Sequence, residues 1–252
     1  MAKLTRFPKD VEAVTERVLK QAGRAVAAEA GRLTGKGGLN ESHGEKQKKK
    51  IATEVKQLFP VKDDGGRIYD LIKAKDEVLA KQFWAAYKAN NEKLQNALMR
   101  KAGVARALDE SAHKRIRKSG GRKASTIPLA VVAAGRQRSY IGRNQKTVGL
   151  VKGGWFAAGK SLGGRQRTQT AEGKKIETFP AYVRRHGRKS SLGGSSYTKG
   201  KNARLRIWNS VRHIGEVMPA NVQRQAVAGA QKRLAKAFEA ELKYLNKKRG
   251  RR

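Results

Sequence analysis

The positive charge of this chain is concentrated in its second half. Residues 1–110 carry 23 basic and 15 acidic side chains, whereas residues 111–252 carry 35 and 5. Two long segments, Ser111 to Ala171 and Thr178 to Gly215, contain no Asp or Glu. A net charge of +38 disfavours a compact state through self-repulsion unless an anionic partner neutralises it. The distribution therefore predicts a basic face that is held against nucleic acid or an acidic protein.

Composition sets further bounds on the chain. Its 252 residues allow one large domain or two small ones, and 38% hydrophobic residues predict a modest core. The absence of cysteine excludes disulfides, thiolate metal sites and cysteine nucleophiles. No apolar run approaches about 20 residues, so we expect no membrane span. The first residues, "MAKLTRFPKD", lack the apolar core of a secretory signal, so an intracellular or virion-borne protein is expected.

The first half of the chain has the hydrophobic periodicity of helices. A stripe at i, i+3 and i+4 spacing predicts a helix over Asp10 to Leu33, which the segment "GKGGLN" ends. A polar helix is predicted from Glu41 to just before Pro60. Two or three short helices follow, with start signals at Asp76-Glu77 and Asn90-Asn91. The first half is therefore expected to be helical.

The composition becomes basic and glycine-rich at Gly120-Gly121, which predicts a helical region over 1–118 and a basic α+β module over 119–252. In that module we expect a buried strand in "STIPLAVVAAG", a basic helix, a half-buried strand and a long amphipathic helix entered through "MPAN". The basic helix is placed over 136–162, the strand over 203–211, and loops over 163–175 and 188–202. The predicted fold class is α+β, in which a helical N-terminal region precedes a small antiparallel sheet flanked by helices.

A nucleotide-binding motif occurs in "GLVKGGWFAAGKSLGG". Gly154, Gly159, Lys160 and Ser161 match G-x-x-x-x-G-K-[ST] in every position. A working phosphate loop needs a strand before it and small residues between its glycines, so that backbone N–H groups can surround phosphate. The middle positions here include the bulky Trp155, and the preceding "TVGLVKGG" is a poor strand. We therefore interpret the match as fortuitous.

The same segment is better explained as the end of a basic helix. In this interpretation Trp155, Phe156 and Leu162 are core anchors, and Lys152 and Lys160 face outwards. Gly163 would then occupy the left-handed position that ends the helix.

Other catalytic patterns are weak. The four histidines, His43, His113, His186 and His213, lie far apart and lack metal-ligand spacing. Adjacent acidic residues lie near predicted turns and helix starts, where capping explains them. A G-x-S-x-G pattern surrounds Ser161, but the required strand and helix are on the wrong sides. We expect no catalytic residue, no bound metal and no cofactor, so enzymatic activity is the weaker hypothesis.

Clusters of basic residues are the stronger candidates for a functional site. Such clusters suit sequence-independent contact with a phosphate backbone, which needs charge density and reach more than fixed geometry. The alternatives are contact with an acidic protein or a solvated surface. The candidate nucleic-acid-binding residues are Lys114, Arg115, Arg117, Lys118, Arg122, Lys123, Arg136, Arg138, Arg143, Lys146, Arg184, Arg185, Arg188 and Lys189.

The second half contains, in order, "VGLVKGGWFAAGKSLGG", "IETFPAYVRRHG" and "LRIWNSVRHIGEVMP" before a long helix, and "GRIYDLIKAKDEVLAKQFWAAYKANN" precedes them. This order of motifs resembles that of minor virion proteins of tailed bacteriophages. The resemblance covers roughly residues 65–245. It implies a non-enzymatic neck, connector or tail-completion protein at the head–tail joint, assembled as a ring beside the DNA channel with other virion proteins as partners. Such a protein would be assembled into the virion in the host cytoplasm. The chain departs from the pattern in its basicity and in its longer helical N-terminal part.

Two other classes of function stay open at this point. A free-standing nucleic-acid-binding protein, either nucleoid or ribosome-associated, would explain the charge equally well. A nucleoside triphosphatase would use Lys160 and Ser161.

Overall fold

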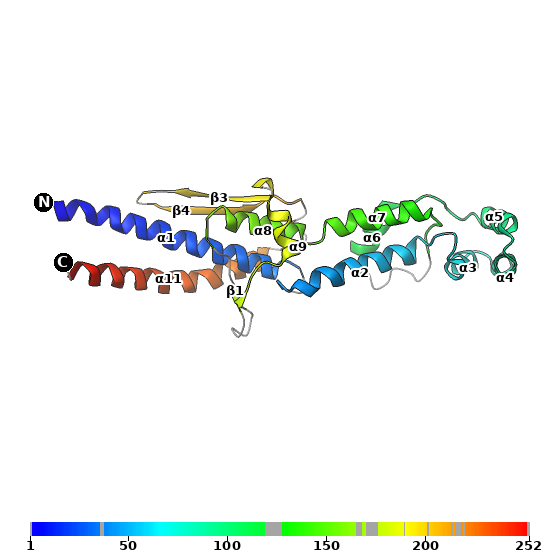
Figure 1. Ribbon diagram of the computed structural model, residues 1–252, viewed down its shortest axis with the longest axis horizontal. Helices are drawn as coiled ribbons and strands as arrows, with labels where there is room; N and C mark the ends of the chain where they lie inside the picture. Colours follow the sequence, from blue (N-terminus) through cyan, green and yellow to red (C-terminus); the bar gives the residue numbers. More distant parts are fainter. Residues whose placement is uncertain are drawn as a thin grey trace. The chain divides into compact units, whose positions relative to one another are not determined.

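The computed structural model has an α+β fold, as predicted (Figure 1). It describes residues 2–35, 38–118, 128–164, 168–169, 176–188, 190–200, 202–212, 214, 218 and 220–250. The α-helices are α1 (Ala2–Leu33), α2 (Glu41–Leu58), α3 (Gly65–Lys73), α4 (Glu77–Lys88), α5 (Glu92–Lys101), α6 (Glu110–Lys118), α7 (Ala134–Lys146), α8 (Leu150–Lys160), α9 (Ala181–Arg184) and α11 (Ala220–Gly250). The strands and 3-10 helices are β1 (Thr168–Gln169), β2 (Ile176–Glu177), η1 (His186–Arg188), η2 (Ser190–Leu192), β3 (Gly193–Thr198) and β4 (Arg204–Asn209).

The chain forms two compact units. Unit 1 combines Met1–Gly44 with Val148–Arg252, and unit 2 is Glu45–Thr147. This division differs from the predicted one, whose boundary after residue 118 lies inside unit 2. The cause is long-range packing, because α1 contacts α8, β4 and α11, and the first helix therefore belongs with the last part of the chain.

Unit 1 is built on the antiparallel pair of α1 and α11 and on the hairpin of β3 and β4 (Figure 1). Side chains of one face of the hairpin reach α1 and α8, and Arg24 of α1 donates hydrogen bonds to the carbonyls of Leu162 (3.1 Å) and Gly163 (3.0 Å). The alternation predicted for the second strand is confirmed, since its residues are exposed and half-buried in turn. The predicted C-terminal helix is α11. The buried core of the unit contains Ala28, Ala30, Leu39, Trp155, Phe179, Tyr182, Val183, Met218 and Ala226.

Unit 2 contains a small bundle of α3, α4 and α5. Ile68, Ile72 and Phe83 are fully buried at its centre. Asp76 caps α4 by accepting a hydrogen bond from the Leu79 N–H (2.9 Å), and Asn91 caps α5 in the same way. Each cap satisfies a backbone donor that has no partner inside its helix. The two predicted start signals are therefore confirmed.

A second part of unit 2 packs α2, α6 and α7 around buried aromatic and polar side chains. Phe59 is fully buried and meets the rings of His113 and Tyr140 edge to face. Nδ1 of His113 lies 2.8 Å from the Tyr140 hydroxyl, and the Gln137 amide donates to the Phe59 carbonyl at 2.7 Å. These bonds allow polar groups to be buried without a large desolvation cost.

Three expectations for the second half are wrong. The described part of the predicted strand, residues 128–133, is an extended segment whose N–H groups donate to Leu58, Pro60 and Ala105, at separate points rather than along one partner strand. The basic helix predicted over 136–162 is two helices, α7 and α8, because Gly149 adopts a left-handed φ of +88° between them. The predicted loops over 163–175 and 188–202 contain strands β1 and β3, respectively.

Candidate nucleic-acid interface

The segment that matches the nucleotide-binding motif is helical. Gly154 and Gly159 lie within α8, and Ser161 is its C-terminal cap. The N–H of Ser161 is bonded to the Ala157 carbonyl (3.1 Å), so it serves the helix and does not face a phosphate. A Cβ on Gly154 would lie 2.1 Å from Oδ1 of Asn209 on β4, so this glycine permits close packing of α8 against the hairpin. These residues do not form a phosphate-binding loop.

The expected anchors of this helix are largely confirmed, with one error. Trp155 and Leu162 are buried, Phe156 is partly buried, and Gly163 has a left-handed φ of +71°. Lys152 was expected to face outwards and is instead buried, with its ammonium group donating to the carbonyl of Gly38. The reason is helical geometry, because residue 152 lies three and four positions before the two aromatic anchors and shares their side of the helix.

Replacing Lys152 with Met is expected to lower the free energy of unfolding by about 1–3 kcal/mol. The variant keeps much of the buried volume but removes the donor that satisfies the Gly38 carbonyl. The measurement is urea unfolding of the full chain, with Lys160→Met as the control because Lys160 is an exposed residue of the same helix. Equal stability of both variants would show that the buried ammonium group contributes nothing.

The structure divides the predicted basic residues between the two units. Unit 2 holds Lys114 and Arg115 on α6 and four candidates on α7, and all six are exposed. Arg136, Arg143 and Lys146 lie on one side of α7 because they are seven and three residues apart, whereas Arg138 lies on the other flank. The α7 candidates are Arg136, Arg138, Arg143 and Lys146.

One arginine of α7 is held by neighbouring groups, and two are not. Arg143 pairs with Glu110 (2.7 Å) and lies 5.6 Å from the centre of the Tyr140 ring. Arg136 and Arg138 make no ion pair with another described residue. Among the arginines of α7, the latter pair is therefore the better placed for contact with a phosphate.

Unit 1 holds three of the predicted basic residues, close together in the chain. Arg184 ends α9, Arg185 follows it, and Arg188 ends η1, all exposed. Nε of Arg185 lies 3.4 Å from Nε2 of His186, which in turn lies 3.0 Å from the Val148 carbonyl. Arg117 and Lys118 lie in α6, but the surroundings of their side chains are not described. Arg122, Lys123 and Lys189 lie outside the described residues.

The sequence-based assignment missed a basic and aromatic surface on the hairpin. Arg204, Arg206 and Trp208 alternate along β4 on the face turned away from α8, and all three are exposed. Their cross-strand partners on β3 are Thr198, Ser196 and Gly194. We call these six residues the outer face of the hairpin. The signal was present as a period-2 pattern, but it was used only to predict the strand.

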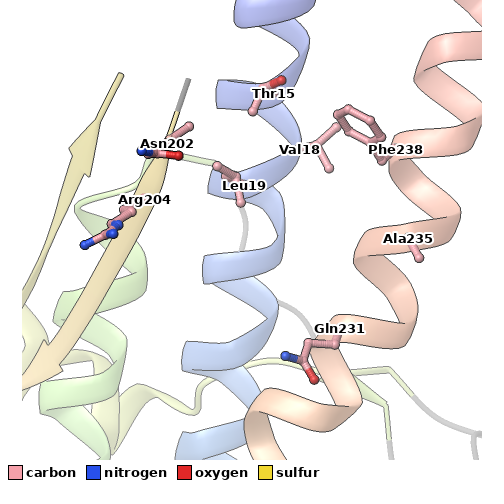
Figure 2. Close-up of a pocket in the computed structure, with 9 residues that line it drawn as sticks. Thr15, Val18, Leu19, Asn202, Arg204, Gln231, Ala235 and Phe238 are labelled. Atoms are coloured by element: carbon pink, nitrogen blue, oxygen red, sulfur yellow. The ribbon is translucent and has the colours of Figure 1, made fainter. Parts of the chain in front are cut away.

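A groove of about 650 Å³ lies between α1, α11 and the beginning of β4 (Figure 2). Figure 2 shows Val18 of α1 and Phe238 of α11 pointing toward each other, while Asn202 and Arg204 come from the segment that begins β4. The lining is mainly apolar, and Figure 2 shows the guanidinium group of Arg204 pointing away from α1 and α11. This arrangement suits an apolar side chain of another molecule rather than a charged substrate.

The described residues offer little support for other kinds of site. No group of three or more His, Asp or Glu in the described ranges is arranged to hold a metal ion. Within the same ranges, no helix combines the length and the apolar character that a membrane span requires. The chain matches no protein-family model, no curated protein and no solved structure.

Proposed function

We propose that this protein is a structural component of a tailed-phage particle, located at the head–tail joint as a neck, connector or tail-completion protein. Its copies would form a ring, and the basic side chains of its second half would contact DNA or acidic neighbouring subunits. The proposal draws on the order of motifs in the second half and on the geometry of unit 1. It treats the protein as a scaffold rather than an enzyme.

The observation that carries the proposal is the exposure of basic side chains without acidic neighbours in unit 1. Arg184, Arg188, Arg204 and Arg206 form no ion pair with any residue in the part of the chain that the structure describes. By contrast, several cations of the first helices are paired within their own helix, as in Lys20 with Glu16 and Lys81 with Glu77. Unpaired surface cations at this density attract an external polyanion.

The groove between α1 and α11 supports the assembly part of the proposal. Its apolar lining offers a surface that a neighbouring subunit can cover, and the exposed Val227, one turn before Gln231, extends this apolar surface along α11. Closed rings require a contact of this head-to-tail kind, in which two different surfaces of the same chain meet.

A free-standing nucleic-acid-binding protein is the second candidate, and the exposed arginines of α7 favour it. Arg136 and Arg138 are in unit 2, so cationic surface is present in both units. Sequence-independent binding through both units would need no particle.

Fractionation of particles from the native source separates the two candidates. If the proposal is correct, the protein sediments with intact particles on a density gradient, stays with them after nuclease treatment, and is seen as a ring at the head–tail joint by labelled-antibody imaging. Recovery of the protein only in the soluble fraction, bound to host nucleic acid, would contradict the virion role and favour the second candidate.

A further inference from the structure

The two faces of the β3–β4 hairpin have different surroundings. The inner face is covered, because Leu205 packs so closely on α1 that a Cβ on Gly23 would lie 2.4 Å from it. On the same face, Asn209 donates a hydrogen bond to the Val151 carbonyl of α8 (2.8 Å). The outer face is therefore turned away from both helices, and its side chains are available to a partner.

Trp208 lies flat on this outer face. Its cross-strand partner is Gly194, and a Cβ at Gly194 would come 2.7 Å from the indole carbon Cζ2. The glycine thus leaves room for the ring to rest on the backbone of β3. Trp208 is 39% exposed, so the side of the indole away from Gly194 is open. An indole held in this way is a stacking platform for another flat ring.

Arg206 and Arg204 continue the same face beyond Trp208. Alternate residues of a strand are about 6.7 Å apart, so the indole and the two guanidinium groups follow one line. Opposite the arginines stand Ser196 and Thr198, which are small and uncharged. The two guanidinium groups are thus not neutralised by the hairpin itself.

The surroundings of the hairpin remain cationic. Glu16 of α1 approaches the hairpin, where its carboxylate is 3.6 Å from the Lys199 ammonium. It also accepts a hydrogen bond from Lys20 (2.6 Å), which is the largest cause of its lowered pKa. This carboxylate therefore has two cationic partners and does not offset Arg204 or Arg206.

We propose that the outer face of the hairpin binds single-stranded nucleic acid, with Arg204 and Arg206 contacting phosphates and an unpaired base stacked on Trp208. This inference rests on the proposed function in assuming that unit 1 meets nucleic acid. Alternation of cationic and aromatic side chains along one line is how proteins hold single strands without reading their sequence. A duplex offers phosphates but no free base face, so Trp208 gives the surface a preference for the unpaired form.

The first test compares two exposed aromatic residues in the full chain by fluorescence anisotropy. The probes are a labelled oligothymidine and a labelled duplex of the same length. Trp208→Ala is expected to weaken binding of oligothymidine by about 5- to 150-fold, with a much smaller effect on the duplex. The matched control is Tyr244→Ala, on α11 beside Lys243 and Lys247, which is expected to leave both affinities unchanged. Equal effects of the two variants would overturn the proposal.

A second readout places the base on the indole directly. The three tryptophans can be labelled with 5-fluorotryptophan and followed by fluorine NMR, with the Trp208 signal assigned from Trp208→Phe. Addition of oligothymidine is expected to shift that signal and to leave those of Trp84 and the buried Trp155 in place. An unshifted Trp208 signal at saturating oligothymidine would overturn the stacking contact. The Trp84 and Trp155 signals serve as a folding control, because unchanged positions of these signals in the variants show that both units are folded.

The charged part of the surface has its own control. Arg204→Ala with Arg206→Ala is expected to reduce oligothymidine affinity more than Arg136→Ala with Arg138→Ala, which removes the same charge from α7. Binding to the duplex alone, or equal losses in the two double variants, would overturn the hairpin site. Neither result bears on whether the protein is a component of particles, because fractionation tests that question separately.

Discussion

Raising the salt concentration from 50 to 200 mM is expected to weaken binding of the full chain to duplex DNA by about 10³-fold or more. Each basic side chain that contacts a phosphate displaces condensed counterions, so the affinity falls steeply with salt. The loss of about 10³-fold corresponds to roughly six phosphate contacts. The exposed arginines of α7, α9, η1 and β4 are numerous enough to supply them. Anisotropy titrations at several salt concentrations give the slope.

Alanine variants identify the side chains that contribute to this salt dependence. Each arginine that touches phosphate is expected to reduce the slope by about one when it is replaced by alanine. The first residues to replace are Arg184, Arg185 and Arg188, because they are exposed and close together in unit 1. Lys81→Ala is the control, since this exposed lysine already pairs with Glu77. A salt-independent affinity, or no binding at 50 mM salt, would exclude DNA as the partner of the basic residues and leave an acidic protein.

Replacing Gly193 with Ala is expected to destabilise unit 1 by about 3 kcal/mol. The new Cβ would lie 2.2 Å from the Gly154 carbonyl oxygen and 2.9 Å from that of Trp208. Both atoms belong to the backbone of packed elements, so the clash can be relieved only by moving α8 away from the hairpin. Added volume in a well-packed site typically costs about 1–3 kcal/mol, and backbone obstacles place this site at the upper end.

Chemical unfolding followed by tryptophan fluorescence and circular dichroism measures this effect. The matched control is Gly142→Ala in α7, where a Cβ would meet no atom within 4 Å. That variant is expected to be more stable than the parent by about 1 kcal/mol, because alanine favours a helix over glycine. A Gly193→Ala variant as stable as the parent would mean that α8 and the hairpin are not packed as closely as described.

Local signals predicted much of the helical part of the fold. Asp76 and Asn91 act through hydrogen bonds that span three residues, so the neighbouring sequence is sufficient to recognise them. The period of β4 was recognisable because one face of the strand is covered and the other is open. These features depend on residues that are near in sequence.

The features that could not be predicted from the sequence depend on long-range packing. β3 has the sequence "GGSSYT", which reads as a loop, yet Gly193 is needed where its backbone meets that of Gly154. The side of α8 on which Lys152 lies follows from its spacing to Trp155 and Phe156, but the acceptor that allows its burial, the carbonyl of Gly38, lies more than a hundred residues earlier. Nothing near either position in the sequence reports these partners.

Only part of the candidate site could be predicted from the sequence, because the rest also depends on long-range packing. Composition identified exposed basic residues such as Arg136 and Arg184, but it did not reveal that they belong to different units. Composition also gave no reason to separate Arg204 and Arg206 from other strand residues. The alternation of β4 already placed them on one face with Trp208, but the pairing with β3 that puts Gly194 opposite the indole is a long-range contact that the sequence did not show.

The interleaved make-up of unit 1 has a consequence for its biosynthesis. Unit 2 is a single continuous segment, so all its contacts become available as soon as residue 147 leaves the ribosome. The partner of α1 is α11, which is translated after every other element of unit 1, so the side of α1 that α11 covers must stay open or be shielded by a chaperone until then. Ribosome-nascent chains stalled before residue 220 should therefore contain a native unit 2 beside an unfinished unit 1.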